Sequence, residues 1–324
     1  MRTILILLAM TTVCFCPARG QAGSDASNQP RGLSVPRASA LPAGPEWPEL
    51  SLNVLILDRA KQPYTRADAS TFHLLQDSVP QTIQSVEAMD APVSLWLLID
   101  NSASTRTIHS QISDAVTAVV KDLPPGSEVM AVQFGWKSSV VLPFTPAASV
   151  DPSVFAQLKP DGGNAVFDAV LAADTYLAKH AHHERRAVVL INDGDENASN
   201  HSLEDVERSL LSPGGALLYV LNIPDQWSIS AHSVPYEHFM KIINGMGDGL
   251  VFDARGEKDV LSRAAEISEA IRSQYVLTYT STDTARDGRL HQLDLRIVQG
   301  KTRLQIHGLP AYYAPGRPAD PSVH

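Results

Sequence analysis

The stretch Ser94-Leu-Trp-Leu-Leu-Ile-Asp-Asn-Ser-Ala-Ser104 decides the fold, because it joins an unbroken apolar run to a polar loop. The run from Ser94 to Ile99 suits a strand that is buried on both faces of a sheet. Asp100 follows the run directly, and Ser102 and Ser104 come two and four residues later. In an open α/β sheet, ligands bind at the carboxyl ends of strands near the point where the strand order reverses. The stretch therefore predicts a central strand with a polar site at its end.

Segments of two kinds alternate beyond this stretch. Further short apolar runs predict four more strands: Val129 to Phe134, Ala187 to Ile191, Ala216 to Leu221 and Leu250 to Phe252. Between the strands lie stretches with the apolar spacing of one helical face, such as Ile108 to Leu123. This alternation predicts an α/β fold with a doubly wound, mostly parallel, Rossmann-like sheet. The segment from Ser139 to Phe144 follows its predecessor too closely for a crossover and should form an antiparallel edge hairpin.

Strand-like period-two patterns flank this unit on both sides. Leu52, Val54 and Ile56 alternate with other residues before it, and Tyr275 to Tyr279 and Leu290 to Val298 follow it. Neither flank has enough strands to form a stable sheet alone. We therefore expect the two flanks to pair into one small β domain, into which the α/β unit is inserted.

The first residues have the layout of a cleavable secretory signal. A charge at Arg2 precedes the apolar run Ile4 to Met10, and small residues follow up to Ala22. We expect a secreted or periplasmic protein without an integral membrane span, because this apolar run is too short. Both cysteines, Cys14 and Cys16, lie in the segment that would be removed. The formal net charge of −9 argues against nucleic acid as a partner.

The polar residues at the strand ends suit a divalent metal. Asp100 with the hydroxyls of Ser102 and Ser104 offers hard oxygen ligands, and Asp193 ends a second predicted strand at the same sheet edge. Mg²⁺ prefers few carboxylates and several waters in octahedral array. We therefore expect Mg²⁺ at this edge, with Mn²⁺ or Ca²⁺ as alternatives.

Three motifs, taken in order, resemble the metal-ion-dependent adhesion site of von Willebrand factor type A (vWA) domains. They are Asp100-x-Ser102-x-Ser104, the segment Gly162 to Asp168, and Asp193-Gly194. The resemblance covers about 94–275 and implies a metal site of Asp100, Ser102, Ser104, Asn164 and Asp193, although the family places threonine where Asn164 stands. The flanks also resemble the secreted vWA-related family that is common in acidobacterial genomes.

With this resemblance, the chain divides into six predicted segments. They are a signal peptide at 1–21, a flexible linker at 22–47, N-terminal strands at 48–92, a vWA domain at 93–273, C-terminal strands at 274–313 and a disordered tail at 314–324. The resemblance implies adhesion-type binding of a protein partner whose acidic side chain completes the metal shell. The sequence contains no GxSxG, HExxH or P-loop motif, so we expect no enzyme.

Two alternatives compete with this interpretation. The chain could be a structural cell-envelope module with a degenerate or merely stabilising metal site, in which Ser102 and Ser104 only cap a helix. The loop from Asp193 to Glu204 has oxygen-bearing residues at several positions of an EF-hand-like calcium loop, but lacks its glycine. We expect Asp195 and Glu196 mainly to shape an acidic rim. Three tryptophans fall in predicted loops: Trp47, Trp136 and Trp227. Each is either an exposed contact residue or a residue of local packing.

Overall fold

The computed structural model describes residues 47–88, 91–183, 185–212, 216–224, 233–246, 250–255, 257–298 and 304–316. The predicted signal peptide, nearly all of the linker, most of the tail, and Trp227 lie outside these residues. Among the described residues, none of the helices has the length and apolar character to cross a membrane.

A six-stranded sheet forms the centre of the α/β unit, with the strand order β10-β9-β8-β5-β6-β7. Its strands are β5 (Ser94–Asp100), β6 (Glu128–Phe134), β7 (Ser139–Pro146), β8 (Arg186–Asn192), β9 (Leu217–Asn222) and β10 (Val251–Asp253). The pairs are parallel except that of β6 with β7, which is antiparallel. Every residue of β5 is buried, as its apolar run predicts. The mostly parallel sheet and the edge hairpin are both confirmed.

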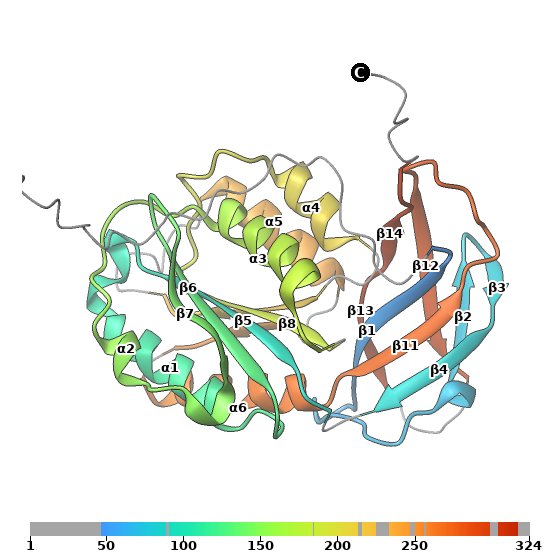
Figure 1. Cartoon of the computed structure of the whole chain (residues 1–324), viewed down its shortest axis with the longest axis horizontal. Helices are drawn as coiled ribbons and strands as arrows, with labels where there is room; N and C mark the ends of the chain where they lie inside the picture. The colour runs from blue at the N-terminus through green and yellow to red at the C-terminus, as the bar shows by residue number, and fades with distance from the viewer. Residues whose placement is uncertain are drawn as a thin grey trace, which may run out of the picture. The chain divides into compact units, whose positions relative to one another are not determined.

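Helices cover both faces of this sheet (Figure 1). Figure 1 shows α3, α4 and α5 on one face and α1, α2 and α6 on the other. Their bounds are α1 His109–Lys121, α2 Ser153–Ala156, α3 Val166–His180, α4 Leu203–Leu210, α5 Val234–Met246 and α6 Glu257–Arg272, with 3-10 turns η1 Ala69–Thr71, η2 Ala103–Thr107 and η3 Ala147–Ser149. Helix α1 buries one stripe, from Ile112 to Val120, as its spacing predicts. Ser268 of α6 donates to the carbonyl oxygen of Val119 in α1.

The two flanks pair with each other in two antiparallel sheets. The strands are β1 Glu49–Leu57, β2 Phe72–Gln76, β3 Val79–Gln81 and β4 Ile83–Ala88 before the α/β unit, and β11 Tyr275–Thr280, β12 Leu290–Ile297, β13 Gln305–Gly308 and β14 Ala311–Tyr313 after it. The sheet orders are β13-β1-β11-β4 and β14-β12-β2-β3. Each sheet therefore contains strands from both flanks, so the predicted insertion of the α/β unit into a β domain is confirmed.

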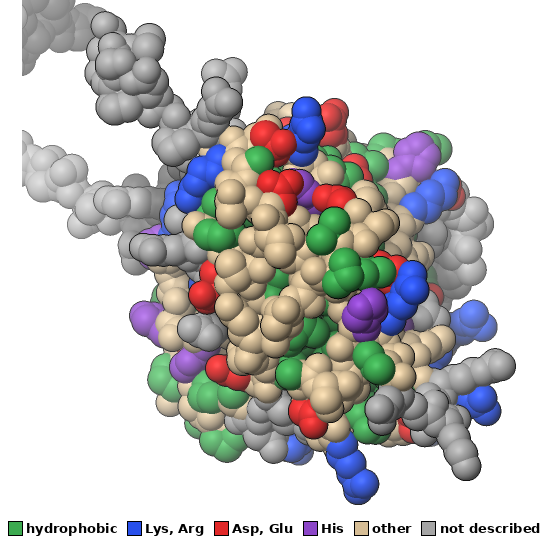
Figure 2. All heavy atoms as spheres, turned by 90° about the vertical axis from the view of Figure 1, so that its right-hand side faces the viewer, with side chains coloured by type: hydrophobic (Ala, Val, Ile, Leu, Met, Phe, Trp, Pro, Cys, Tyr) green, Lys and Arg blue, Asp and Glu red, His purple; other side chains and the backbone are tan. Residues whose placement is uncertain are grey.

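Strand β1 contributes to two cores, because successive side chains of a strand point to opposite faces. Leu50, Leu52, Val54 and Ile56 pack in the core of the β domain with Tyr275 of β11. Leu55 and Leu57 belong instead to the larger core of the α/β unit. The face of the molecule on the side of the β domain carries acidic and basic side chains interspersed (Figure 2).

Candidate metal centre

The loop after β5 places three polar side chains of the predicted site together. Asp100 is 1% exposed, and its Oδ1 accepts a hydrogen bond of 2.8 Å from the backbone N–H of Ser102. The hydroxyl oxygens of Ser102 and Ser104 lie 3.0 Å apart. Although Ser102 stands at the N-cap of η2, its side chain makes no capping hydrogen bond. The proposal that Ser102 serves as a helix cap is therefore wrong: its hydroxyl faces the site.

Asn164 enters the same site from the loop before α3, and its amide fits there in two orientations. In the first, Nδ2 donates to Asp193 Oδ1 at 3.4 Å, and the amide oxygen faces other acceptor oxygens. In the second, the half-turned Nδ2 donates to Ser102 Oγ at 2.8 Å and to the two carboxylate oxygens of Asp100 at 2.9 and 3.0 Å. The side chain is 2% exposed, and the second orientation is the one that satisfies both its oxygen and its nitrogen.

Asp193 follows β8 and brings a second buried carboxylate beside Asp100. Asp193 is 1% exposed. Burial, reinforced by the negative charge of Asp193, raises the pKa of Asp100 well above its ordinary value. Two buried carboxylates in proximity disfavour each other's charged form, and a bound cation removes that penalty. The structure therefore brings together all five residues of the predicted site.

The spacing of the oxygen atoms tests whether these residues fit Mg²⁺. Magnesium–oxygen distances of about 2.0–2.1 Å place neighbouring ligands of an octahedron about 2.9 Å apart. The two serine hydroxyl oxygens are separated by 3.0 Å. This separation fits an edge of a magnesium octahedron.

The Gly162–Gly163 turn holds Asn164 in place through contacts that leave no room for a side chain. The carbonyl oxygen of Gly162 accepts from Ala103 N at 3.0 Å, which ties the turn to the loop after β5. Gly162 has a φ of +91°, and a Cβ atom there would lie 2.0 Å from Cδ1 of Trp136. A Cβ on Gly163 would lie 2.8 Å from Asn197 Oδ1, the atom that accepts from Asn164 N. Both positions therefore require glycine.

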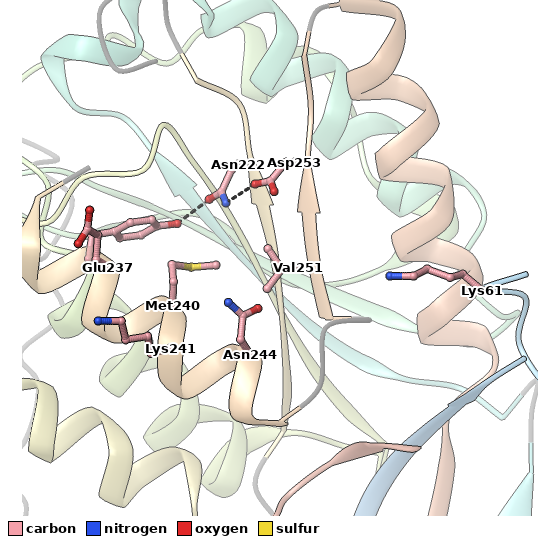
Figure 3. Close-up of a pocket in the computed structure, with 9 residues that line it drawn as sticks. Lys61, Asn222, Glu237, Met240, Lys241, Asn244, Val251 and Asp253 are labelled. Atoms are coloured by element: carbon pink, nitrogen blue, oxygen red, sulfur yellow. Dashed lines mark hydrogen bonds between the residues drawn. The ribbon is translucent and has the colours of Figure 1, made fainter. Parts of the chain in front are cut away.

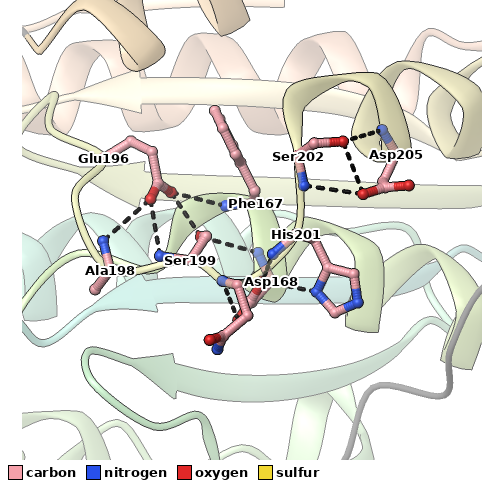
Figure 4. A network of polar contacts seen from close by, with 9 residues as sticks. Phe167, Asp168, Glu196, Ala198, Ser199, His201, Ser202 and Asp205 are labelled. Carbon is pink, nitrogen blue, oxygen red and sulfur yellow. Dashed lines mark hydrogen bonds and ion pairs between the residues drawn. The ribbon is translucent and has the colours of Figure 1, made fainter.

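The acidic loop between β8 and α4 supports α3 instead of forming a rim (Figure 4). Glu196 is 5% exposed and accepts from the backbone N–H of Phe167 in the first turn of α3. It also accepts from the hydroxyl and the backbone N–H of Ser199. The prediction that Glu196 mainly shapes an acidic rim is therefore wrong, because its buried carboxylate bonds Phe167 and Ser199. Its carboxylate compensates the free N–H groups of a helix start.

The same loop also does not have the arrangement of a calcium loop. Asn197 donates from Nδ2 to Asp195, and Ser199 donates to Glu196. Glu204 lies in the first turn of α4 and is exposed. The oxygen atoms are thus engaged in separate hydrogen bonds, which contradicts the EF-hand-like alternative. Across the described residues, no group of three or more His, Cys, Asp or Glu side chains is placed to hold a metal. The centre described above consists of two carboxylates with neutral oxygens.

Asp168, which lies inside the Gly162–Asp168 motif, anchors the loop from the other side. It accepts from the backbone N–H groups of Asn200 and His201 and from His201 Nδ1 at 2.8 Å. Burial opposes its ionisation, but the hydrogen bonds from His201 and Asn200 hold the pKa of Asp168 below its ordinary value. Asp168 thus fixes the loop rather than facing the five site residues.

A second polar cluster, at the ends of β9 and β10, escaped the sequence analysis. Asn222 Nδ2 donates to Asp253 Oδ1 at 2.8 Å, and the buried hydroxyl of Tyr236 donates to Asn222 Oδ1 and lies 3.1 Å from Asn192 Oδ1. Burial raises the pKa of Tyr236. The cluster borders an open pocket of about 570 Å³ that Met240 and Lys241 of α5 also line (Figure 3).

Comparison with known families identifies the α/β unit. The model of the von Willebrand factor type A domain matches residues 95–196, so the chain contains a vWA domain. This match includes all five residues of the candidate metal centre. A search of curated proteins finds no match. The narrower resemblance to secreted acidobacterial proteins stays a prediction.

Solved structures with the same general fold are distant in sequence. A von Willebrand factor type A protein from Catenulispora acidiphila is 11% identical, with 85% of this chain and 75% of that chain covered and a TM-score of 0.46. Mussel byssus proximal thread matrix protein 1 with a zinc-occupied MIDAS motif is 13% identical, with 60% and 49% covered and a TM-score of 0.47. Manganese-loaded Plasmodium vivax TRAP protein is 15% identical, with 69% and 95% covered and a TM-score of 0.43. Likenesses at this level carry no argument about ligands.

Proposed function

We propose that the chain is an exported, metal-dependent protein-binding vWA module of the adhesion type. Asp100, Ser102 and Ser104 would hold Mg²⁺ directly, and Asn164 and Asp193 would do so directly or through water. When bound, the ion supplies an electrophilic centre that accepts a carboxylate of the partner protein. The module performs no catalysis in this proposal.

One observation carries the proposal above the others. The carboxylates of Asp100 and Asp193, each 1% exposed, lie beside each other at the ends of β5 and β8, next to the hydroxyls of Ser102 and Ser104. Two buried carboxylates in proximity disfavour each other's ionisation, and a divalent cation between them removes that penalty. The pairing of these carboxylates therefore favours a cation.

A second candidate function rests on the second orientation of the Asn164 amide. When Nδ2 of Asn164 faces inward, it donates to Asp100 and Ser102 and satisfies them without a metal. The vWA domain would then be a structural interaction module of the cell envelope with a degenerate site. Threonine, the residue of the family's pattern, has a single hydroxyl donor and cannot offer two N–H groups in this way.

Isothermal titration calorimetry separates the two candidates. The full chain, freed of metal by EDTA, is titrated with Mg²⁺, Mn²⁺ and Ca²⁺, and Asp253→Asn serves as the control because Asp253 lies at another strand end. The proposal expects saturable binding of Mg²⁺ or Mn²⁺ by both proteins. Capture of partners from an envelope extract should then be lost in EDTA. Absence of divalent binding would leave the structural module as the function.

Export is a separate part of the proposal and rests on residues 1–21. The layout of these residues is typical of a cleavable secretory signal. Expression of the full chain in a bacterium, with fractionation and mass spectrometry, should yield a mature protein outside the cytoplasm that begins near Gly20 to Ala22. An intact N-terminus in the cytoplasm would contradict it.

A further inference from the structure

Trp136 is the most exposed large hydrophobic side chain of the described residues, at 73%. It lies in the hairpin between β6 and β7, two residues beyond the strand residue Phe134, whose carbonyl oxygen accepts from Asn101 N in the loop after β5. Trp47, by contrast, donates from its indole to Thr284 O and packs near Tyr312, so it serves local packing. Only one of the two described loop tryptophans is thus a candidate contact residue.

The indole of Trp136 lies against the glycine turn that precedes Asn164, despite its exposure. A Cβ on Gly162 would collide with the indole at 2.0 Å, and one on Gly163 would lie 3.8 Å from Trp136 Cε2. The ring therefore packs on the backbone that leads into Asn164. A tryptophan that is already packed loses little conformational entropy when a partner covers its free side. Large aromatic side chains of this kind dominate the energetics of many interfaces.

Three exposed cations lie on the segments around this tryptophan. Lys137 follows it in the hairpin, and Arg106 of η2 donates to Pro160 O at 3.2 Å. Lys159 directly precedes Pro160, and its carbonyl oxygen accepts from Asn101 Nδ2 at 2.9 Å. None of these three cations forms an ion pair within the part of the chain that the structure describes. Asp161 is the anion among them.

We propose that Arg106, Trp136, Lys137 and Lys159, here called the tryptophan rim, bind an acidic peptide segment that carries a large apolar side chain beside its metal-binding carboxylate. The inference rests on the proposed function and adds the chemistry of the partner. The apolar side chain covers the indole, and further carboxylates of the segment face the cations of the rim.

Charge selects this occupant over two others. A second copy of the chain carries a formal net charge of −9 and would be repelled. An extended nucleic acid needs a long basic surface to release its counterions, whereas the rim has three cations interrupted by Asp161. At physiological salt, charge interactions are screened beyond about 8 Å, so the local cations outweigh the distant acidic residues for a short segment.

Selection from a random dodecapeptide library displayed on phage tests the inference. The full chain is immobilised in Mg²⁺ buffer, and bound phage are eluted with EDTA. Wild type, Trp136→Ala and the control Leu261→Ala are compared, because Leu261 is a large exposed side chain, 47% exposed, on α6. Wild type and control should enrich peptides with an acidic residue next to an aromatic or large aliphatic one. Trp136→Ala should retain the acidic residue and lose the apolar one.

A selected peptide labelled with fluorescein then provides affinities by fluorescence anisotropy. Trp136→Ala should weaken its binding by about tenfold, and Trp136→Phe by less. Calorimetric Mg²⁺ affinity should remain unchanged in both variants. The double variant Arg106→Glu, Lys137→Glu should weaken the binding of peptides with several carboxylates more than the binding of peptides with one.

Three outcomes would overturn the inference. Identical enrichment on wild type and Trp136→Ala would show that the rim makes no contact with the ligand. Loss of Mg²⁺ binding in Trp136→Ala would show that the indole only supports the Asn164 loop. Tight, Trp136-dependent binding of a labelled dodecathymidylate would make nucleic acid the ligand. If wild type binds no metal at all, the proposed function itself fails, and calorimetry shows this before any peptide is used.

Discussion

The parallel sheet has two polar clusters at the carboxyl ends of its strands, and they differ in how their donors and acceptors balance. At the ends of β9 and β10, Asn222, Asp253 and Tyr236 satisfy one another through hydrogen bonds. At the ends of β5 and β8, the carboxylates of Asp100 and Asp193 lie among hydroxyls and an amide. Position at a strand end therefore does not by itself predict a metal site. The pairing of two buried carboxylates is what distinguishes the candidate centre from the other cluster.

Asp100→Ala should have the largest effect on this comparison, because it removes the central carboxylate of the metal centre. Wild type should gain about 2.7 kcal/mol of unfolding free energy at a Mg²⁺ concentration of one hundred times Kd. Asp100→Ala should gain nothing and should show no Mg²⁺ or Mn²⁺ binding by calorimetry. Its circular dichroism should match wild type. Asp253→Ala, at the balanced cluster, should bind metal as wild type does. If Asp100→Ala also binds metal as tightly as wild type, the assignment of the metal site is wrong.

Asp174→Asn tests whether a single buried carboxylate responds to Mg²⁺ in the way expected of the paired carboxylates Asp100 and Asp193. Asp174 of α3 accepts from Ser209, and burial raises its pKa to about 6. Because the folded protein holds this proton more tightly than the unfolded chain, this contribution to stability falls as the pH rises from about 4 to about 6. The contribution amounts to up to about 3 kcal/mol.

Urea unfolding at several pH values measures this contribution. The slope of the unfolding free energy against pH should differ between wild type and Asp174→Asn from about pH 4 to about pH 6. This difference should be the same in Mg²⁺ and in EDTA, since Asp174 lies apart from the five site residues. A slope difference that depends on Mg²⁺ would show that Asp174 is coupled to the metal centre.

Tyr236→Phe breaks the balanced cluster without removing any of the five candidate metal ligands. The Asn222 carbonyl oxygen would lose its buried donor, so unfolding free energy should fall by about 1–3 kcal/mol in urea titrations. Mg²⁺ affinity should stay within about threefold, less than 1 kcal/mol. Tyr176→Phe is the control, because its hydroxyl makes no hydrogen bond among the described residues. A large loss of metal affinity in Tyr236→Phe would mean that the two clusters act as one.

Asn164→Thr should have only a small effect on metal binding and should sharpen the comparison at its most unusual residue. The threonine hydroxyl can still face the cation, so Mg²⁺ affinity should change by about threefold or less. The amide fixes the loop more firmly than a hydroxyl can, so affinity for the selected peptide should change more. If the substitution creates metal binding where wild type shows none, the site is degenerate and the structural module is the better description.

Much of the fold could be predicted because it depends on local periodicity. The apolar run of β5, the stripe of α1 and the short link to β7 each reflect the backbone geometry of neighbouring residues. The acidic loop was harder, because Asp195 and Glu196 are adjacent and chemically alike. Their different roles depend on the start of α3. There the backbone N–H of Phe167, 29 residues before Glu196 in the sequence, donates to the Glu196 carboxylate.

The sequence by itself determined the residue types at the strand ends, the alternation of strands and helices, and the need for the two flanks to pair. Only the tertiary structure decided that Asn164 lies within 3.0 Å of Asp100 and Ser102, that Ser102 does not cap its helix, and that the indole of Trp136 packs on Gly162. Periodicity is a property of the local chain, whereas these contacts join loops far apart in sequence. Their distances depend on how the helices and strands pack, and that packing sets which acceptors are left facing one another.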